Sequence, residues 1–244
     1  MIRVCVSGRT GKMGQEVIRA VNLASDMELA ATAGREDNLA EIVVSCGVDV
    51  VVDFTHPSTV FDNVVHIVRA GKHAVVGTTG LSHSEIEQIN SEARSQGVGV
   101  LIAPNFSLGA VLAMKCAADI ARYFKQASIL EYHHDEKADA PSGTAIHTAE
   151  YILAHAGAMN PPKIKSEERY ASQSLGVDIG NIPVHAVRLP GFIASQEIVF
   201  GGQGETIHIR HDSMSRECFI PGVLLAVRKI SSCRGVVIGL EDIL

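Results

Sequence analysis

The sequence predicts an α/β protein in which a doubly wound parallel sheet is followed by an α+β domain with an open, mainly antiparallel sheet. Up to residue 104, short β-branched segments alternate with helical segments, which is typical of βα units around a parallel sheet. From residue 183 onward, three segments alternate apolar and polar residues, and a short glycine-bounded turn joins the last two. This second pattern is typical of antiparallel strands that bury one face.

The first part of the chain contains five expected strands and three expected helices. We expect strands at 2–6, 28–34, 48–55, 73–80 and 98–107, and helices at 14–25, 57–71 and 82–97. The last helix has the clearest ends, because Ser82 and Glu85 form a capping-box pattern and Gly97 is a typical stop. Ligands of a doubly wound sheet bind at the carboxyl ends of its strands.

The second part of the chain begins with an apolar helix and ends by returning to the first. We expect helices at 108–124, 144–157 and 219–233, strands at 127–134, 183–189, 194–202 and 205–213, and a long polar loop at 158–182. The tail at 235–244 is expected to rejoin the first domain. The predicted domains are therefore 1–105 with 215–244, and 106–214.

Composition favours a small-molecule partner over a nucleic acid or a membrane. The chain has 244 residues, 46% of them hydrophobic, which is enough for a substantial core. Its net charge of −6 and pI near 6.0 offer no basic surface for nucleic acid or anionic lipid. The five cysteines form no Cys-x-x-Cys pair, and the N-terminus lacks a signal-peptide pattern. We therefore expect reduced thiols and a cytoplasmic location.

A glycine-rich turn follows the first strand. "SGRTGKMG" places Gly8, Gly11 and Gly14 between a strand and a helix, where a backbone can approach a pyrophosphate. A plain tight turn is the alternative, and a phosphate-loop ATPase fits less well because Met13 cannot ligate magnesium. "DFTHP", "GTTG" and "APNFS" stand at three further strand ends, so the pattern indicates one dinucleotide crevice in a Rossmann-like domain.

The end of the second strand is where a residue that reads the adenosine ribose is expected. Arg35 could contact a 2′-phosphate, so NADPH should be accepted, whereas Glu36 or Asp37 could reach a ribose hydroxyl and admit NADH. A solvated turn is an alternative for any one of these residues.

The segment "EYHHDEKADAPSGTA", residues 131–145, has three interpretations. A metal site is disfavoured because His133 and His134 would point to opposite faces of a strand and no further ligands complete a set. A solvated charged loop is reasonable, since acidic residues balance the basic ones. In the catalytic interpretation, a histidine donates or accepts a proton, and Lys137 delivers a proton or holds a carboxylate. The helix N-terminus at 142–144 binds an anion, which implies an acidic substrate.

This segment resembles the signature E-x-H-H-x-x-K-x-D-A-P-S-G-T-A of the dihydrodipicolinate reductase family. The segments "SGRTGKMG", "DFTHP", "GTTG" and "APNFSLG" match other family segments in order, so the resemblance covers nearly the whole chain. It implies reduction of a cyclic dicarboxylate, 4-hydroxy-tetrahydrodipicolinate, to tetrahydrodipicolinate with NADPH or NADH and loss of water, in diaminopimelate and lysine biosynthesis. It also implies a dinucleotide-binding first domain, a substrate-binding and oligomerisation second domain, and a homotetramer.

The resemblance also implies roles for individual residues. His133 and Lys137 would be catalytic. His134, Ser142, Gly143 and Thr144 would bind the substrate. The cofactor-binding set would be Gly8, Arg9, Thr10, Gly11, Lys12, Met13, Arg35, Gly77, Thr78, Thr79, Ala103, Pro104, Asn105 and Phe106. The chain departs from the family pattern at Gly34, where many members have an acid, and in a short link between the second and third strands.

Two other functions remain open at this point. Another oxidoreductase of the same architecture, such as an aspartate or homoserine-type dehydrogenase, would lack the His-His-x-x-Lys segment in this form. A non-catalytic dinucleotide-binding regulator would keep the fold without needing the proton donors.

Overall fold

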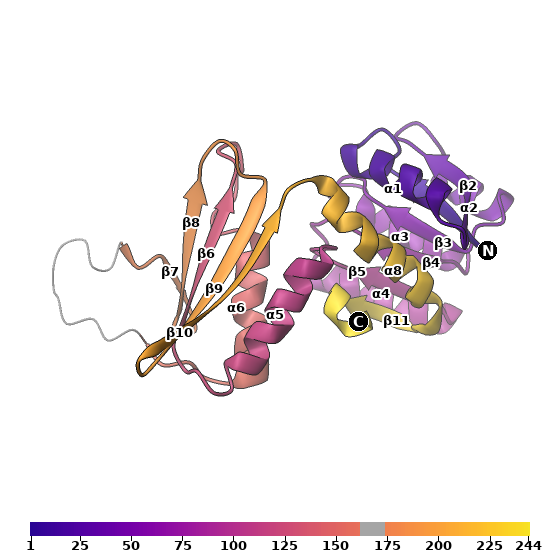
Figure 1. Cartoon of the computed structure of the whole chain (residues 1–244). Helices are drawn as coiled ribbons and strands as arrows, with labels where there is room; N and C mark the ends of the chain where they lie inside the picture. The colour runs from indigo at the N-terminus through magenta and orange to yellow at the C-terminus, as the bar shows by residue number, and fades with distance from the viewer. Residues whose placement is uncertain (162–173) are drawn as a thin grey trace. The chain divides into compact units, whose positions relative to one another are not determined.

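The computed structural model of the protein describes residues 1–161 and 174–244 (Figure 1). The chain divides into two compact units, Met1–Leu108 with Arg216–Leu244, and Gly109–Ser215. Residues 162–173 of the long loop expected at 158–182 lie outside the described residues.

The first unit contains a six-stranded parallel sheet. Its strands are β1 (Ile2–Ser7), β2 (Met27–Ala33), β3 (Val50–Asp53), β4 (His73–Val76), β5 (Gly99–Ile102) and β11 (Gly235–Ile238), in the order β11-β5-β4-β3-β1-β2. All five pairings are parallel. The five expected strands are confirmed, and the tail rejoins this sheet as its sixth strand. The chain moves outward from β1 to β2 and then returns to β3 on the other side of β1, so the topological switch point lies between β1 and β3.

Helices pack against this sheet in two groups. One contains α1 (Lys12–Leu23) and α8 (Ile220–Lys229), which contact each other, and the other contains α2 (Leu39–Ser45), α3 (Val60–Arg69) and α4 (His83–Gln96) (Figure 1). Right-handed crossovers that run in opposite directions from one switch point place their helices on opposite faces. A strand covered on both faces has no solvent side. This explains why all four residues of β3, three of them valines, are buried.

The sequence predicted the ends of α4 but missed α2. Ser82 and Glu85 form the expected capping box, and Gly97 ends α4 in the left-handed conformation. The sequence predicts only a short link between the second and third strands, but residues 39–45 of this link form a helix, and Asn38 caps it by accepting a hydrogen bond from the N–H of Glu41. Asn followed three residues later by Glu is the signal that could have revealed α2.

The second unit contains a five-stranded sheet with the order β10-β9-β6-β8-β7. The strands are β6 (Ala127–His133), β7 (Val177–Ile179), β8 (Ile182–Arg188), β9 (Ala194–Gly202) and β10 (Glu205–Ser213). Only the β6–β8 pairing among these is parallel, so the sheet is mainly antiparallel as predicted. β7 was missed, because three residues within a polar segment give no visible periodicity.

Two helices, α5 (Leu108–Ile120) and α6 (Gly143–Ala156), pack against this second sheet. Their alanines, with Ile152, pack against the large side chains of Ile129, Ile198 and Phe200, so small residues on the helices match large residues on the strands. On β10, exposed His208 and Arg210 alternate with half-buried Ile207 and Ile209, as the period-two pattern predicted. The predicted fold class is thus confirmed in both units.

Three short 3-10 helices complete the described chain: η1 (Arg216–Phe219), η2 (Ile230–Ser232) and η3 (Leu240–Ile243). Helices in residues 1–161 and 174–244 are all too short or too polar to cross a membrane.

Candidate active site

The structure brings four predicted strand ends to one edge of the parallel sheet. β1, β3, β4 and β5 are consecutive neighbours, and each strand end bonds to the next. The N–H of Phe54 donates to the carbonyl of Ser7 at 3.0 Å, that of Gly77 to the carbonyl of Asp53 at 2.9 Å, and that of Ala103 to the carbonyl of Val76 at 3.0 Å. The segments after these strands are therefore adjacent.

The turn after β1 is built so that only glycine fits at two positions. Gly8 has a φ of 94°, and a Cβ on it would lie 2.2 Å from the carbonyl oxygen of Phe54. A Cβ on Gly14, in the first turn of α1, would lie 2.1 Å from the carbonyl oxygen of Gly8. Gly11 is the N-cap of α1 and, as a glycine, provides no side-chain hydrogen bond to the first N–H groups of the helix. A tight turn leading into an uncapped helix N-terminus fits a pyrophosphate.

The cofactor residues implied by the sequence divide by exposure. Exposed positions, which a ligand can reach, are Arg9, Thr10, Gly11, Lys12, Arg35, Thr79 and Pro104. Half-buried positions are Gly8, Met13, Gly77 and Asn105. Thr78, Ala103 and Phe106 are buried, and the Phe106 ring lies 5.7 Å from the Phe54 ring. These last three side chains are packed inside the protein, where they support the segments that follow the strands.

Asp53, the last residue of β3, is a buried carboxylate that sequence reasoning missed. Its Oδ1 accepts hydrogen bonds from the hydroxyls of Thr55 and Thr78, both at 2.7 Å, and its Oδ2 accepts from the side-chain amide of Asn63 at 3.0 Å. The Thr78 hydroxyl in turn accepts from the N–H of Thr55 at 2.7 Å. Asp53 therefore ties the segment after β3 to the one after β4. An acid directly after three consecutive valines was the available signal.

At the end of β2, an acid and an arginine are already paired. Asp37 accepts from the N–H of Gly34 at 2.7 Å and forms an ion pair with Arg9. Arg9 lies over Gly34, because a Cβ there would be 3.3 Å from its Nε. Arg35 is exposed. Arg9 and Arg35 thus lie near the predicted adenosine end of the site, and the nearby carboxylate of Asp37 already has partners in Arg9 and Gly34.

In the second unit, the motif is organised around Glu131 in the middle of β6. The Glu131 side chain is fully buried, and its carboxylate lies 2.5 Å from Nδ1 of His133. Arg188, at the end of β8, donates to both carboxylate oxygens at 2.6 and 2.8 Å, and the N–H of Ser142 donates to one at 3.0 Å. Burial alone would raise the pKa of Glu131, but these hydrogen bonds lower it to about 2. Glu131 is therefore ionised throughout the neutral range.

Glu131 and Arg188 were not predicted as site residues. A glutamate inside the apolar run "ILEY" was a visible signal for a buried carboxylate. Nothing near Arg188 in the sequence marks its role, since its partner lies 57 positions earlier.

The other predicted residues of the motif lie between β6 and α6. Lys137 donates to Asp139 at 2.6 Å, and this pairing lowers the pKa of Asp139. His134 is exposed and lies just beyond the end of β6, where its carbonyl accepts from the N–H of Lys137 in a turn. His133 and His134 therefore do not lie on opposite faces of one strand, because β6 ends at His133.

The N-terminus of α6 contains the remaining predicted residues. Ser142 is buried and serves as the N-cap, its hydroxyl accepting from the N–H of Ala145 at 3.2 Å. Gly143 is exposed and Thr144 is half-buried. The side chain of Ser142 is thus used within the protein, and the carboxylate of Asp139 accepts a backbone hydrogen bond from Gly143, so this helix end already binds one carboxylate. The described residues contain no group of three His, Cys, Asp or Glu side chains placed to hold a metal ion.

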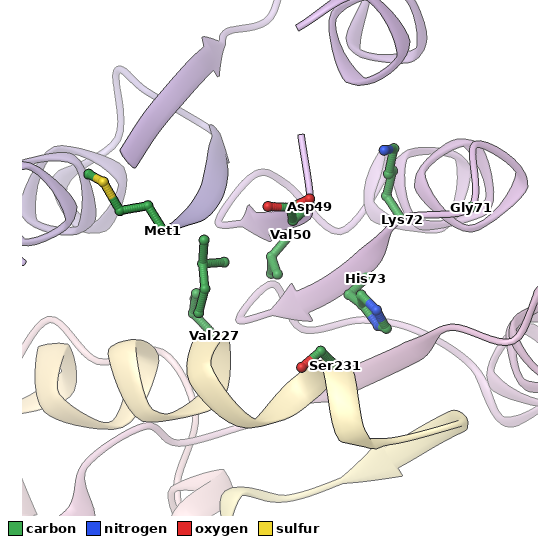
Figure 2. A pocket seen from close by; sticks show the side chains of 9 residues that line it. Met1, Asp49, Val50, Gly71, Lys72, His73, Val227 and Ser231 are labelled. Carbon is green, nitrogen blue, oxygen red and sulfur yellow. The ribbon is translucent and has the colours of Figure 1, made fainter. Parts of the chain in front are cut away.

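A separate pocket of about 400 Å³ opens at the amino ends of the parallel strands (Figure 2). Ile2, Val50 and His73, the first residues of β1, β3 and β4, line it. His73 accepts from the N–H of Gly99 at 2.9 Å, and burial lowers its pKa, so it joins β4 to β5 as a neutral side chain. The pocket lies at the sheet edge opposite the glycine turn and is not part of the candidate site.

Comparisons with known proteins cover the whole chain. A family model for the N-terminus of dihydrodipicolinate reductase matches residues 2–106, and one for its C-terminus matches residues 109–244. The chain is 46% identical to 4-hydroxy-tetrahydrodipicolinate reductase of Mycolicibacterium smegmatis over 244 residues, covering 100% of this chain and 99% of the relative. It is 43% identical to the enzyme of that name in Coxiella burnetii, covering 100% and 99%.

A solved structure agrees with these matches. Dipicolinate-bound dihydrodipicolinate reductase from Paenisporosarcina sp. TG-14 superposes with a TM-score of 0.90 at 37% identity, covering 100% of both chains. Matches in sequence and in structure thus extend over both units and include the glycine turn and the motif on β6 and α6. The chain belongs to the dihydrodipicolinate reductase family of oxidoreductases.

Proposed function

We propose that the protein reduces 4-hydroxy-tetrahydrodipicolinate to tetrahydrodipicolinate, with loss of water, at the expense of NADH or NADPH, in diaminopimelate and lysine biosynthesis. The observation that carries this proposal is the cluster at the end of β6, where His133 contacts a buried carboxylate close to the N-terminus of α6. Support also comes from the names of the relatives and from the dipicolinate-bound state of the superposed reductase, since dipicolinate is a cyclic dicarboxylate.

The substrate dicarboxylate would bind at the N-terminus of α6. The N–H groups at Gly143 and Thr144 and the positive end of the helix dipole favour a carboxylate there. Lys137 supplies a cationic donor and His134 a ring N–H from the adjoining turn, and Lys137 already holds a carboxylate, that of Asp139. A side chain that binds one carboxylate at 2.6 Å has the geometry to exchange it for another.

Proton transfer would fall to His133 and Lys137. The overall reaction adds a hydride and one proton to the substrate and releases one water, so the protein must deliver protons at the reacting atoms. Bound NADH or NADPH supplies the hydride, and the protein supplies protons, charge and orientation. His133 suits this role because imidazole exchanges protons near neutral pH, and its side chain is only 14% exposed, which limits exchange with bulk water.

The cofactor would bind to the first unit. The glycine turn and the uncapped α1 N-terminus would hold the pyrophosphate, Gly77, Thr78 and Thr79 and the segment Ala103–Phe106 would contact the nicotinamide half, and Arg35 would lie near the adenosine ribose. The predicted dinucleotide domain, 1–105 with 215–244, and the predicted substrate and oligomerisation domain, 106–214, follow from this assignment. We also propose a cytoplasmic homotetramer assembled through the open sheet of the second unit, which light scattering after gel filtration would test.

The assay follows nicotinamide absorbance with enzymatically generated 4-hydroxy-tetrahydrodipicolinate. We expect oxidation of at least one of NADH and NADPH, and a loss of at least about 10²-fold in kcat for His133→Ala and for Lys137→Ala. Glu150→Gln, an exposed carboxylate on α6, is the matched control and should retain wild-type activity. Failure to oxidise either cofactor would refute the proposed reaction, and full activity in a folded His133→Ala variant would refute the role of His133.

A further inference from the structure

The hydrogen bonds around Glu131 constrain the proton on His133. Glu131 keeps its charge at neutral pH, because its hydrogen bonds outweigh its burial and lower its pKa to about 2. An ionised carboxylate can only accept hydrogen bonds. Nδ1 of His133, 2.5 Å from Oε2, must therefore be the donor and must carry a proton. In the neutral ring the lone pair is then on Nε2, for which the described residues provide no hydrogen-bond partner.

We propose that Glu131, held in place by Arg188, is a positioning residue that locks His133 in the Nδ1–H tautomer and presents Nε2 as the nitrogen that exchanges protons with the substrate. This inference rests on the proposed catalytic role of His133, but the tautomer itself is independent of any activity. The arrangement has the logic of a carboxylate–histidine pair in which the carboxylate orients the ring and does not itself transfer the proton.

Arg188 holds both the Glu131 carboxylate and the neighbouring turn in place. It donates to Oε1 and Oε2 of Glu131, and its Nη2 also donates to the carbonyl oxygen of Asp139 at 2.8 Å. Arg188 and its carboxylate partner are both largely buried, with side chains 18% and 0% exposed. The same guanidinium therefore fixes the carboxylate behind His133 and the turn that contains Lys137. Sharing the charge of Glu131 with Arg188 also keeps the carboxylate from acting as a free base.

The contacts predict an unusual outcome for Glu131→Gln. The Oε1 position faces two donors that cannot change, the N–H of Ser142 and Nη2 of Arg188. The amide oxygen of the glutamine should occupy this position, so its NH₂ group faces His133 and also Nη1 of Arg188, which keeps the carbonyl oxygen of Val187 as its acceptor. The imidazole is the one neighbour that can switch from donor to acceptor. His133 should therefore move its proton to Nε2, and Nδ1 should accept from the amide.

The first measurement uses the unmodified protein. Histidine ¹⁵N spectra of the uniformly labelled chain distinguish protonated from unprotonated ring nitrogens, and His133→Gln identifies the His133 signals among those of the 11 histidines. We expect neutral His133 to carry its proton on Nδ1. A neutral wild-type ring protonated at Nε2 would overturn the proposal, whether or not any variant folds.

The second measurement compares Glu131→Gln with Glu150→Gln. We expect Glu131→Gln to reverse the His133 tautomer and to lower kcat by about 10²- to 10⁴-fold, with a much smaller change in the KM for substrate. Glu150→Gln should change neither. A folded Glu131→Gln variant that keeps the Nδ1–H tautomer, or keeps its kcat, would refute the positioning role. If the wild type has the expected tautomer but reduces no substrate, the proposed reaction fails while the tautomer assignment stands.

Discussion

Acidification should remove the stabilisation that Glu131 gives to the second unit, and Glu131→Gln should remove it at every pH. Burial alone would raise the pKa of this carboxyl, but hydrogen bonds from His133 and Arg188 and the charge of His133 lower it from 4.5 to about 2. A carboxyl whose pKa is lower in the folded state stabilises that state above its unfolded pKa. The stabilisation is lost as the pH falls from about 4.5 towards about 2.

The size of this effect follows from the two pKa values. The difference between 4.5 and about 2 corresponds to about 3 kcal/mol of unfolding free energy at neutral pH. Because the side chain is fully buried, solvent screening does not reduce this figure strongly. About 3 kcal/mol remains at pH 5 and about 1 kcal/mol at pH 3, so this one group should remove about 2 kcal/mol between these values.

Tyrosine fluorescence offers a selective assay. The chain has no tryptophan, and its four tyrosines, at 123, 132, 151 and 170, all fall within the second unit, Gly109–Ser215. Urea titrations at pH 5 and pH 3 would give the unfolding free energy of that unit for wild type, Glu131→Gln and Glu150→Gln. We expect wild type and Glu150→Gln to lose about 2 kcal/mol more than Glu131→Gln between the two pH values. An equal loss in all three proteins would show that Glu131 does not hold a lowered pKa, and the reasoning would be wrong.

Three further predictions concern the first unit. Gly8→Ala should destabilise the protein by clearly more than Gly71→Ala, which should cost about 1 kcal/mol because Gly71 has a similar positive φ but no atom within 4 Å of an added Cβ. Urea denaturation followed by circular dichroism measures both costs. Equal costs would contradict the close approach of Gly8 to Phe54. Asp53→Ala should raise the KM for the nucleotide about tenfold by releasing two ligand-facing segments, and an unchanged KM would mean that they keep their positions without it. Arg35→Ala should raise the KM for NADPH about tenfold and that for NADH much less, whereas an unchanged NADPH constant would exclude a 2′-phosphate contact.

The sequence by itself determined the features that depend only on residues close together along the chain. The capping box of Ser82 and Glu85 specifies the start of α4 because both partners lie within one helical turn. The strands β9 and β10 have the expected bounds because period-two alternation and a short turn set their register. The glycine turn after β1 and the motif at 131–145 were recognisable for the same reason, since each occupies one continuous segment.

Only the tertiary structure decided which distant groups meet. Strand order placed the segment after β3 beside the one after β4, which is why Asp53 contacts Thr78, 25 positions away. The parallel register of β6 and β8 sets His133 opposite Arg188, and so brings a guanidinium to the buried Glu131. Hydrogen bonds between such partners depend on which strands pair and in what register, and that is fixed by packing across the whole sheet and not by local sequence. The tautomer inferred for His133 is therefore a property of the fold.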